Sequence, residues 1–207
     1  MGYTHYYQRV IGKDHDQETW NKFVADCKYL YKHMPEHSKS AGDYYSDRPL
    51  MLNGCGGYEK PQFTKTRIYF NGTGTTKRIT KSTTDTKTGK VTTYWEDDET
   101  GLPDELKDLG HETFVILRKV RKQDDWRSDK KAIFNFCKTA CKPYDLMVTA
   151  CLILYKYYFR NDVQISSDGN EEDWSEACKF IGVALPHGKG VIVELKLSEI
   201  LFERNIA

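Results

Sequence analysis

Apolar residues recur at spacings of three and four between residues 20 and 34, which is the pattern of an amphipathic helix. Asp14 or Asp16 can cap the start of this helix, and Pro35 ends it. It is the clearest amphipathic helix in the chain. Its predicted buried positions are Trp20, Phe23, Val24, Cys27, Leu30, Tyr31 and Met34.

Period-two patterns predict several strands. In residues 3–9, alternation places Tyr3, His5 and Tyr7 on one face, and Thr4 and Tyr6 on the other. Further runs with strand character cover residues 66–71, 111–117, 163–166 and 191–197, and a basic run, 118–122, follows the second of them.

Three further helices are expected in the second half of the chain. Ser128 or Asp129 begins one that carries Ile133, Phe134, Cys137 and Cys141, and Pro143 ends it. Residues 144–159 form the next helix, which is apolar nearly all round and should be the central buried element. A third helix covers residues 171–181, and the last residues are read as a short helix.

Residues 73–110 interrupt this arrangement with polar sequence. The runs 77–84 and 90–95 flank Thr88-Gly89, which predicts a protruding hairpin rich in Thr and Lys and without a core of its own. Strands and helices do not alternate regularly, which favours an α+β fold. We therefore expect one domain, residues 1–207, in which a small mixed or antiparallel sheet packs against three to four helices, with the hairpin inserted at about 73–110.

Composition narrows the class of protein. The chain has 207 residues, of which 13% are aromatic, and this aromatic content argues against disorder. The net charge of +1 disfavours non-specific nucleic-acid binding unless the basic residues are locally clustered. No apolar run approaches the ~20 residues that span a bilayer. Because the N-terminus does not resemble a signal peptide, the six cysteines are expected to be reduced thiols in the cytoplasm of the host cell.

Catalytic and metal-binding signatures are weak. Cys137 and Cys141 have no second Cys/His pair nearby to complete a zinc site, so neither a metal nor a cofactor is expected. No flanking signature supports a catalytic cysteine or serine. His111-Glu112-Thr113 resembles one His-x-Thr motif of the two-histidine phosphodiesterases, but a second copy is absent from the sequence. One copy cannot supply both a general acid and a general base.

Polar residues crowd the expected helix–proline–helix junction around Pro143. A helix that begins at Pro143 would direct free backbone N–H groups at an anion. Alternatively, the lysines form a solvated face and the aspartate only caps the helix. The residues concerned are Lys138, Thr139, Lys142, Tyr144 and Asp145.

Several short segments together resemble a family of uncharacterised small proteins encoded by tailed phages and prophages. They are Met-Gly-Tyr-Thr-His-Tyr at residues 1–6, Phe-Asn-Gly at 70–72, His-Glu-Thr-Phe at 111–114, Phe-Cys-Lys-Thr-Ala at 136–140 and Lys-Pro-Tyr-Asp at 142–145. The resemblance implies no particular activity. It directs attention to polar residues that either converge in one cleft or hold strand ends together. With two tyrosines added, the candidate ligand-binding residues are Thr4, His5, Tyr6, Asn71, His111, Glu112, Thr113, Lys138, Thr139, Lys142, Tyr144 and Asp145.

Three functions follow as hypotheses. The first is a phage accessory protein that binds a small anionic ligand and sequesters a nucleotide-derived signal of host defence. The second is a hydrolase that acts on a phosphoester or glycosidic bond through His111 and Glu112. The third is an inhibitor that binds a host protein through the Thr/Lys hairpin. The absence of a catalytic signature in the sequence favours a binding protein over an enzyme.

Overall fold

The computed structural model describes residues 3–10, 14–54, 59–73, 77–98, 101–119, 132–195, 197 and 200–202. Helices and mainly antiparallel sheets give an α+β fold, which confirms the expected class. Four α-helices lie within the described residues, beside three short 3₁₀ segments. The α-helices are α1 (Gln17–Lys32), α2 (Asp145–Phe159), α3 (Ser175–Ala184) and α4 (Gly188–Glu194), and the 3₁₀ segments are Asp43–Tyr45, Asp104–Leu106 and Arg160–Asp162.

The first sheet contains the N-terminal strand at its centre and has the order β10-β9-β1-β8. β1 is antiparallel to both β8 and β9, whereas β10 is parallel to β9, so the sheet is mixed. In this register Tyr6 lies between Phe136 of β8 and Ser166 of β9. The strand bounds are β1 (Thr4–Val10), β8 (Ala132–Lys138), β9 (Val163–Ser167) and β10 (Leu201–Phe202).

The second sheet is antiparallel and is built around β4, which pairs with β2, β3 and β7. It contacts the first sheet through side chains of β1: the Tyr7 hydroxyl donates to the Val115 carbonyl at 2.8 Å. Arg9 donates to the carbonyls of Leu117 and Arg118 at 2.9 and 2.8 Å. The strand bounds are β2 (Leu52–Asn53), β3 (Gln62–Phe63), β4 (Arg67–Gly72) and β7 (Phe114–Leu117).

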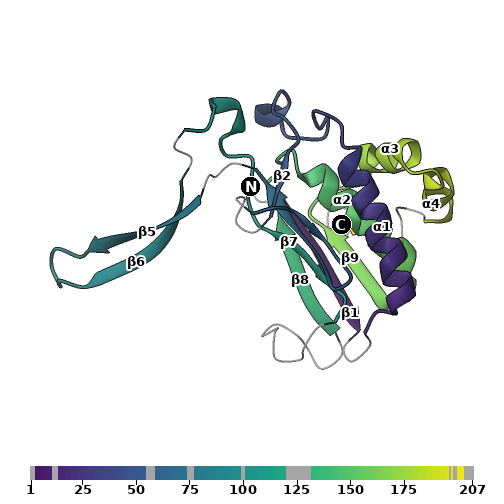
Figure 1. Ribbon diagram of the computed structural model, residues 1–207, viewed down its shortest axis with the longest axis horizontal. Helices are drawn as coiled ribbons and strands as arrows, with labels where there is room; N and C mark the ends of the chain where they lie inside the picture. Colours follow the sequence, from purple (N-terminus) through teal and green to yellow (C-terminus); the bar gives the residue numbers. More distant parts are fainter. Residues whose placement is uncertain are drawn as a thin grey trace.

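The core lies between these sheets and the helices (Figure 1). Every residue of α2 from Asp145 to Lys156 is buried, which agrees with its expected central position. α1 begins as expected, because the Asp16 carboxylate accepts the Thr19 N–H at 2.9 Å and caps it. Its buried positions, Trp20, Phe23, Val24, Cys27 and Leu30, are all among those predicted.

Three assignments from the sequence are wrong. The segment expected as a helix around residues 133–141 is strand β8 followed by a turn, so Pro143 lies in a strand–turn–helix junction. The segment 191–197, expected as a strand, contributes to helix α4. Leu201 and Phe202, expected in a terminal helix, form the short strand β10, and the expected helix start at residues 128–129 lies outside the described residues.

The polar insertion forms the hairpin of β5 (Lys77–Thr84) and β6 (Val91–Asp98), which projects away from the body (Figure 1). Each strand pairs only with the other. Every residue from Thr80 to Tyr94 is exposed, which agrees with an element that lacks a core of its own. Whether the whole chain is one domain stays a prediction.

Two expectations concern the cysteines and the membrane. The five described cysteines, Cys27, Cys137, Cys141, Cys151 and Cys178, are free thiols, and Cys55 lies outside the described residues. Within the described part of the chain, none of the helices has the length and apolar character needed to cross a bilayer.

Candidate functional site

Most of the residues singled out from the sequence meet where β8 turns into α2. The turn is tight: Ala140 and Cys141 both have a φ of 55°, a left-handed conformation that is uncommon for residues other than glycine. The N–H groups of Thr139 and Ala140 both donate to the Tyr3 carbonyl, at 3.0 and 3.2 Å. The turn is therefore fastened to the start of β1.

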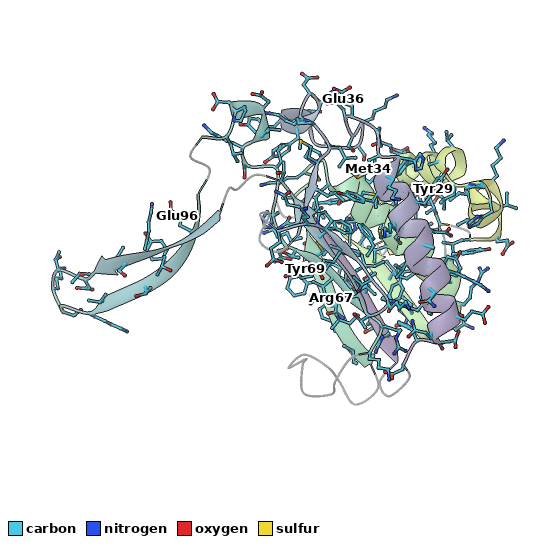
Figure 2. The ribbon with its side chains drawn as sticks, in the orientation of Figure 1. Tyr29, Met34, Glu36, Arg67, Tyr69 and Glu96 are labelled. Atoms are coloured by element: carbon cyan, nitrogen blue, oxygen red, sulfur yellow. The ribbon has the colours of Figure 1, made fainter. Side chains whose placement is uncertain are left out.

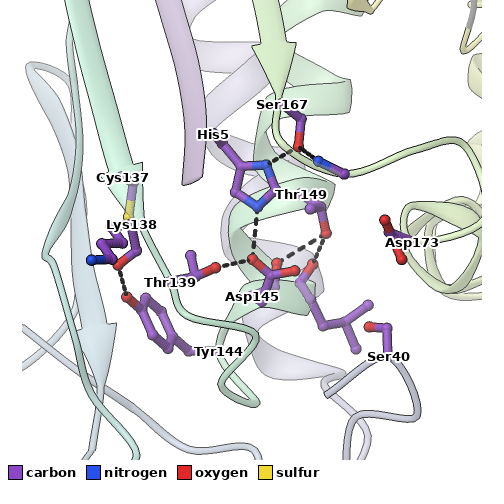
Figure 3. Close-up of polar contacts among 12 residues, drawn as sticks. His5, Ser40, Cys137, Lys138, Thr139, Tyr144, Asp145, Thr149, Ser167 and Asp173 are labelled. Carbon is purple, nitrogen blue, oxygen red and sulfur yellow. Dashed lines mark hydrogen bonds and ion pairs between the residues drawn. The ribbon is translucent and has the colours of Figure 1, made fainter. Parts of the chain in front are cut away.

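His5 lies at the centre of this junction, in a group that we call the His5 cluster (Figure 3). Its Nε2 lies 2.7 Å from Asp145 Oδ1, and its Nδ1 lies 3.0 Å from Ser167 Oγ. Because an ionised carboxylate only accepts, we assign the proton to Nε2, and Nδ1 then accepts from the Ser167 hydroxyl. Thr139 Oγ1 donates to the same carboxylate oxygen at 2.5 Å. The cluster consists of His5, Thr139, Asp145 and Ser167.

The row Ser167–His5–Asp145 resembles the hydrogen-bonded row of serine hydrolases. Ser167 and His5 are both fully buried, so a substrate could reach the serine only if the fold opened. The Ser167 hydroxyl also accepts the Gly169 N–H at 3.1 Å. We therefore interpret the His5 cluster as structural, because it joins β1 and β9 to the first turn of α2.

Asn71 holds the chain at His111. Its side-chain Nδ2 donates to the His111 carbonyl at 2.9 Å, while its Oδ1 accepts the N–H groups of His111 at 3.1 Å and Gly72 at 2.8 Å. Asn71 Nδ2 also lies 3.4 Å from Thr113 Oγ1. His111 is mostly exposed, and partial burial of its ring, together with the positive charge of Lys142, lowers its pKa. His5 and His111 therefore do not share an open pocket.

Glu112 and Tyr144 hold β8 against the segment before β7. Glu112 Oε2 accepts the Lys138 N–H at 2.6 Å, and the Glu112 N–H donates to the Lys138 carbonyl at 3.2 Å. The buried Tyr144 hydroxyl donates to the Glu112 carbonyl at 2.9 Å. Glu112 is a poor candidate for a general base, because its carboxylate already accepts a hydrogen bond from the Lys138 N–H.

Lys142 is buried rather than solvated, which corrects the reading of this residue from the sequence. Its Nζ donates to Asp108 Oδ1 at 2.6 Å and to the Gly110 carbonyl at 2.7 Å. Thus Lys142 holds the chain segment before β7.

The backbone N–H groups at the start of α2 already have hydrogen-bond partners. The N–H groups of the first four residues, 145–148, donate to carbonyls of Lys142, Pro143 and Tyr144. The Asp145 carboxylate already places a negative charge in this first turn. The paired N–H groups and the Asp145 carboxylate argue against a second anion at the start of α2. Ligand binding by the junction residues stays a prediction, and their hydrogen bonds within the protein do not support it.

Thr4 and Tyr6 lie on the other face of β1. Thr4 is paired in register with Lys138, and Tyr6 with Phe136. Tyr6 is half-buried and stacks on Phe134 with ring centroids 6.1 Å apart. These two residues are thus separated by the sheet from the ring of His5.

An open cavity with a basic lining lies on the second sheet, between the β3–β4 turn and the end of β7. Its volume is about 390 Å³. Three of its seven lining residues are cationic and none is acidic. We call it the basic cavity, and it is lined by Gln62, Thr64, Thr66, Arg67, Leu117, Arg118 and Lys119.

Neighbouring groups position the cations of the basic cavity. Arg67 Nε donates to Gln62 Oε1 at 2.8 Å, and its guanidinium lies 5.5 Å from the ring centroid of Tyr69; Figure 2 labels both residues on β4. Arg118 donates from one terminal nitrogen to the His15 carbonyl at 3.0 Å. The Arg118 Nε is buried without a hydrogen-bond partner among the described residues. Lys119 lies 3.2 Å from Asp14 at the surface.

Sequence reasoning selected none of the lining residues of the basic cavity as a candidate. Arg118 and Lys119 begin the basic run that was noticed after the predicted strand, so a signal for half of the cavity existed. Arg67 carried no such signal, because only the pairing of β4 with β7 brings it opposite Leu117. Ser167 was also missed, since nothing in its local sequence distinguishes it.

No protein-family model, curated protein or solved structure matches the chain.

Proposed function

We propose that this protein binds a small anionic ligand of the nucleotide class in the basic cavity, and that it sequesters the ligand rather than converting it. The observation that carries the proposal is the gathering of Arg67, Arg118 and Lys119 around one open cavity without a lining carboxylate. Its volume of about 390 Å³ falls in the range of small-molecule sites.

The chemistry of the lining suits phosphoryl groups. Guanidinium groups donate in a planar fork that matches two phosphate oxygens, and they remain charged at any physiological pH. Arg118 adds a second guanidinium to the lining. The hydroxyls of Thr64 and Thr66 add neutral donors at the same cavity.

Binding without turnover is favoured by what the lining lacks. None of the seven lining residues is a His, Cys, Asp or Glu, the side chains that most often act as a general acid or base near neutral pH. The role against host defence rests on the resemblance of the sequence to the phage family.

Titration calorimetry with ATP, a cyclic dinucleotide and pyrophosphate tests the proposal. Arg67→Gln and Lys119→Gln remove one cation each from exposed positions, and each should weaken binding about 10- to 100-fold, the equivalent of one charge-assisted contact. Lys65→Gln is the matched control, because Lys65 is exposed in the same turn but does not line the cavity. Equal affinities in all four proteins would remove the basic cavity from the site.

A second candidate function is protein binding by the β5–β6 hairpin. The observation in its favour is the exposure of Val91 (60%) and Tyr94 (42%) on an element that projects from the body (Figure 2, where Glu96 marks β6). If a chain without the hairpin still binds its ligand in the basic cavity and still acts against host defence, protein binding by the hairpin is excluded.

A further inference from the structure

The face of the first sheet that points away from the helices carries three aromatic side chains. Tyr6 on β1 and Phe134 and Phe136 on β8 are all half-buried. Their rings form a continuous row, with centroids 6.1 Å apart for Tyr6 and Phe134 and 6.2 Å apart for Phe134 and Phe136. We call this surface the outer aromatic face.

Two amide side chains lie beside these rings. Gln8 of β1 is in register with Phe134 on one side and Gln164 on the other. Gln8 Nε2 donates to Gln164 Oε1, so the Gln8 oxygen can still accept and the Gln164 nitrogen can still donate. Together with Ser166 they line a cavity of about 100 Å³.

We infer that the outer aromatic face binds the bases of a single-stranded nucleic acid. This inference does not depend on the basic cavity, which lies on the second sheet. Bases offer flat faces that stack on aromatic rings, and edges that exchange hydrogen bonds with amides. An apolar protein surface in the same place would leave the polar groups of Gln8 and Gln164 buried without partners, which is unfavourable.

The charge on this face suits a partner that is held mainly by its bases. The net charge of +1 is low for a nucleic-acid-binding protein, so stacking and amide contacts should supply most of the affinity. Lys138 ends β8 on the same face as Phe134 and Phe136, since alternate residues of a strand share a face.

Fluorescence anisotropy with a labelled ten-nucleotide single strand, as RNA and as DNA, tests the inference at low salt. Phe134→Ser should weaken binding by about tenfold or more, the effect expected for loss of one stacked base. Phe134→Tyr should retain binding. Gln164→Glu, at an exposed position, leaves the packing intact and should weaken binding through repulsion of the phosphates. Tyr44→Ala is the control, because Tyr44 is 72% exposed on another part of the chain.

Three results would overturn the inference. One is the absence of binding to either strand. Another is equal affinity of the Gln164→Glu and Phe134→Ser variants and the unchanged protein. The third is a dimer that Phe134→Ser converts to a monomer in sedimentation, without any oligonucleotide binding, since a second copy would then cover the face.

Discussion

At the scale of single residues, the His5 cluster joins three elements through one buried carboxylate. Asp145 has the His5 ring and the Thr139 hydroxyl as partners, and both are buried with it. His5→Ala should lower the free energy of unfolding by about 1.5–3 kcal/mol, because it removes one of the two hydrogen bonds to a buried carboxylate. Ser167→Ala should cost about 1–3 kcal/mol, the value of two neutral hydrogen bonds.

Urea unfolding of the two variants, followed by circular dichroism, measures these losses. Ligand affinity at the basic cavity should stay unchanged in the fraction that remains folded. A stable His5→Ala protein that loses a hydrolytic activity would instead make the row Ser167–His5–Asp145 catalytic.

His15 should make stability depend on pH. Burial, reinforced by the positive charge of Arg9, lowers the pKa of His15 to about 3, whereas an unfolded histidine titrates near 6.5. Between these values the unfolded chain binds the extra proton, so stability falls as the pH falls. From pH 7 to pH 5 the loss due to this residue should be about 2 kcal/mol.

The His15→Gln variant removes this titration. The difference in unfolding free energy between the variant and the unchanged protein should therefore shift by about 2 kcal/mol between pH 7 and pH 5. Parallel stability curves over this range would show that His15 titrates in the folded protein as it does in the unfolded chain.

Lys142 should matter for folding rather than for binding. Its Nζ has two oxygen partners, and its side chain is only 6% exposed. Lys142→Met keeps the aliphatic stem but leaves the Gly110 carbonyl without this donor, and should cost about 1.5–3 kcal/mol. Thermal unfolding measures the loss, and a variant as stable as the unchanged chain would contradict the structural role.

At the scale of elements, the pattern of apolar residues predicted α1 and α2 well but misread β8. Ile133 and Cys137 point into the core, and Phe134 and Phe136 point out. Because apolar residues occupy both faces, the period of two is hidden, and Ile133, Cys137 and Cys141 fit a helix instead. The same outward aromatic residues that hid the strand form the outer aromatic face.

The error at α4 has a different cause. Residues 191–193 are Val-Ile-Val, a β-branched run that favours a strand. In the fold, Val191 and Leu195 are buried four residues apart while Val193 is 79% exposed, which is a helical spacing. Tertiary packing against α3 thus outweighs the local preference.

The β5–β6 hairpin should be dispensable for folding. Its residues from Thr80 to Tyr94 are exposed, so removal of residues 74–98 and closure with a short glycine linker should cost less than about 1 kcal/mol. Calorimetric unfolding of the shortened chain checks this. A much larger loss would show that the hairpin stabilises the body.

At the scale of the whole molecule, the resemblance left open whether the polar residues converge in one cleft or hold strand ends together. His5, Thr139 and Asp145 meet where β8 turns into α2, whereas Asn71 and Glu112 hold neighbouring backbone segments. Their hydrogen bonds are made to each other and to the backbone. The accessible cations lie elsewhere, on residues that meet only through the pairing of β4 with β7 and the β3–β4 turn.

The central proposal, sequestration of a nucleotide-type anion in the basic cavity, has one most direct measurement. The full chain and the Arg67→Gln/Lys119→Gln variant are each incubated with a mixture of nucleotides, passed through gel filtration and heated, and the released molecules are identified by mass spectrometry. We predict that the unchanged protein releases an intact nucleotide and that the variant releases little or none. A chemically altered nucleotide, an empty unchanged protein, or equal release from both proteins would contradict the proposal.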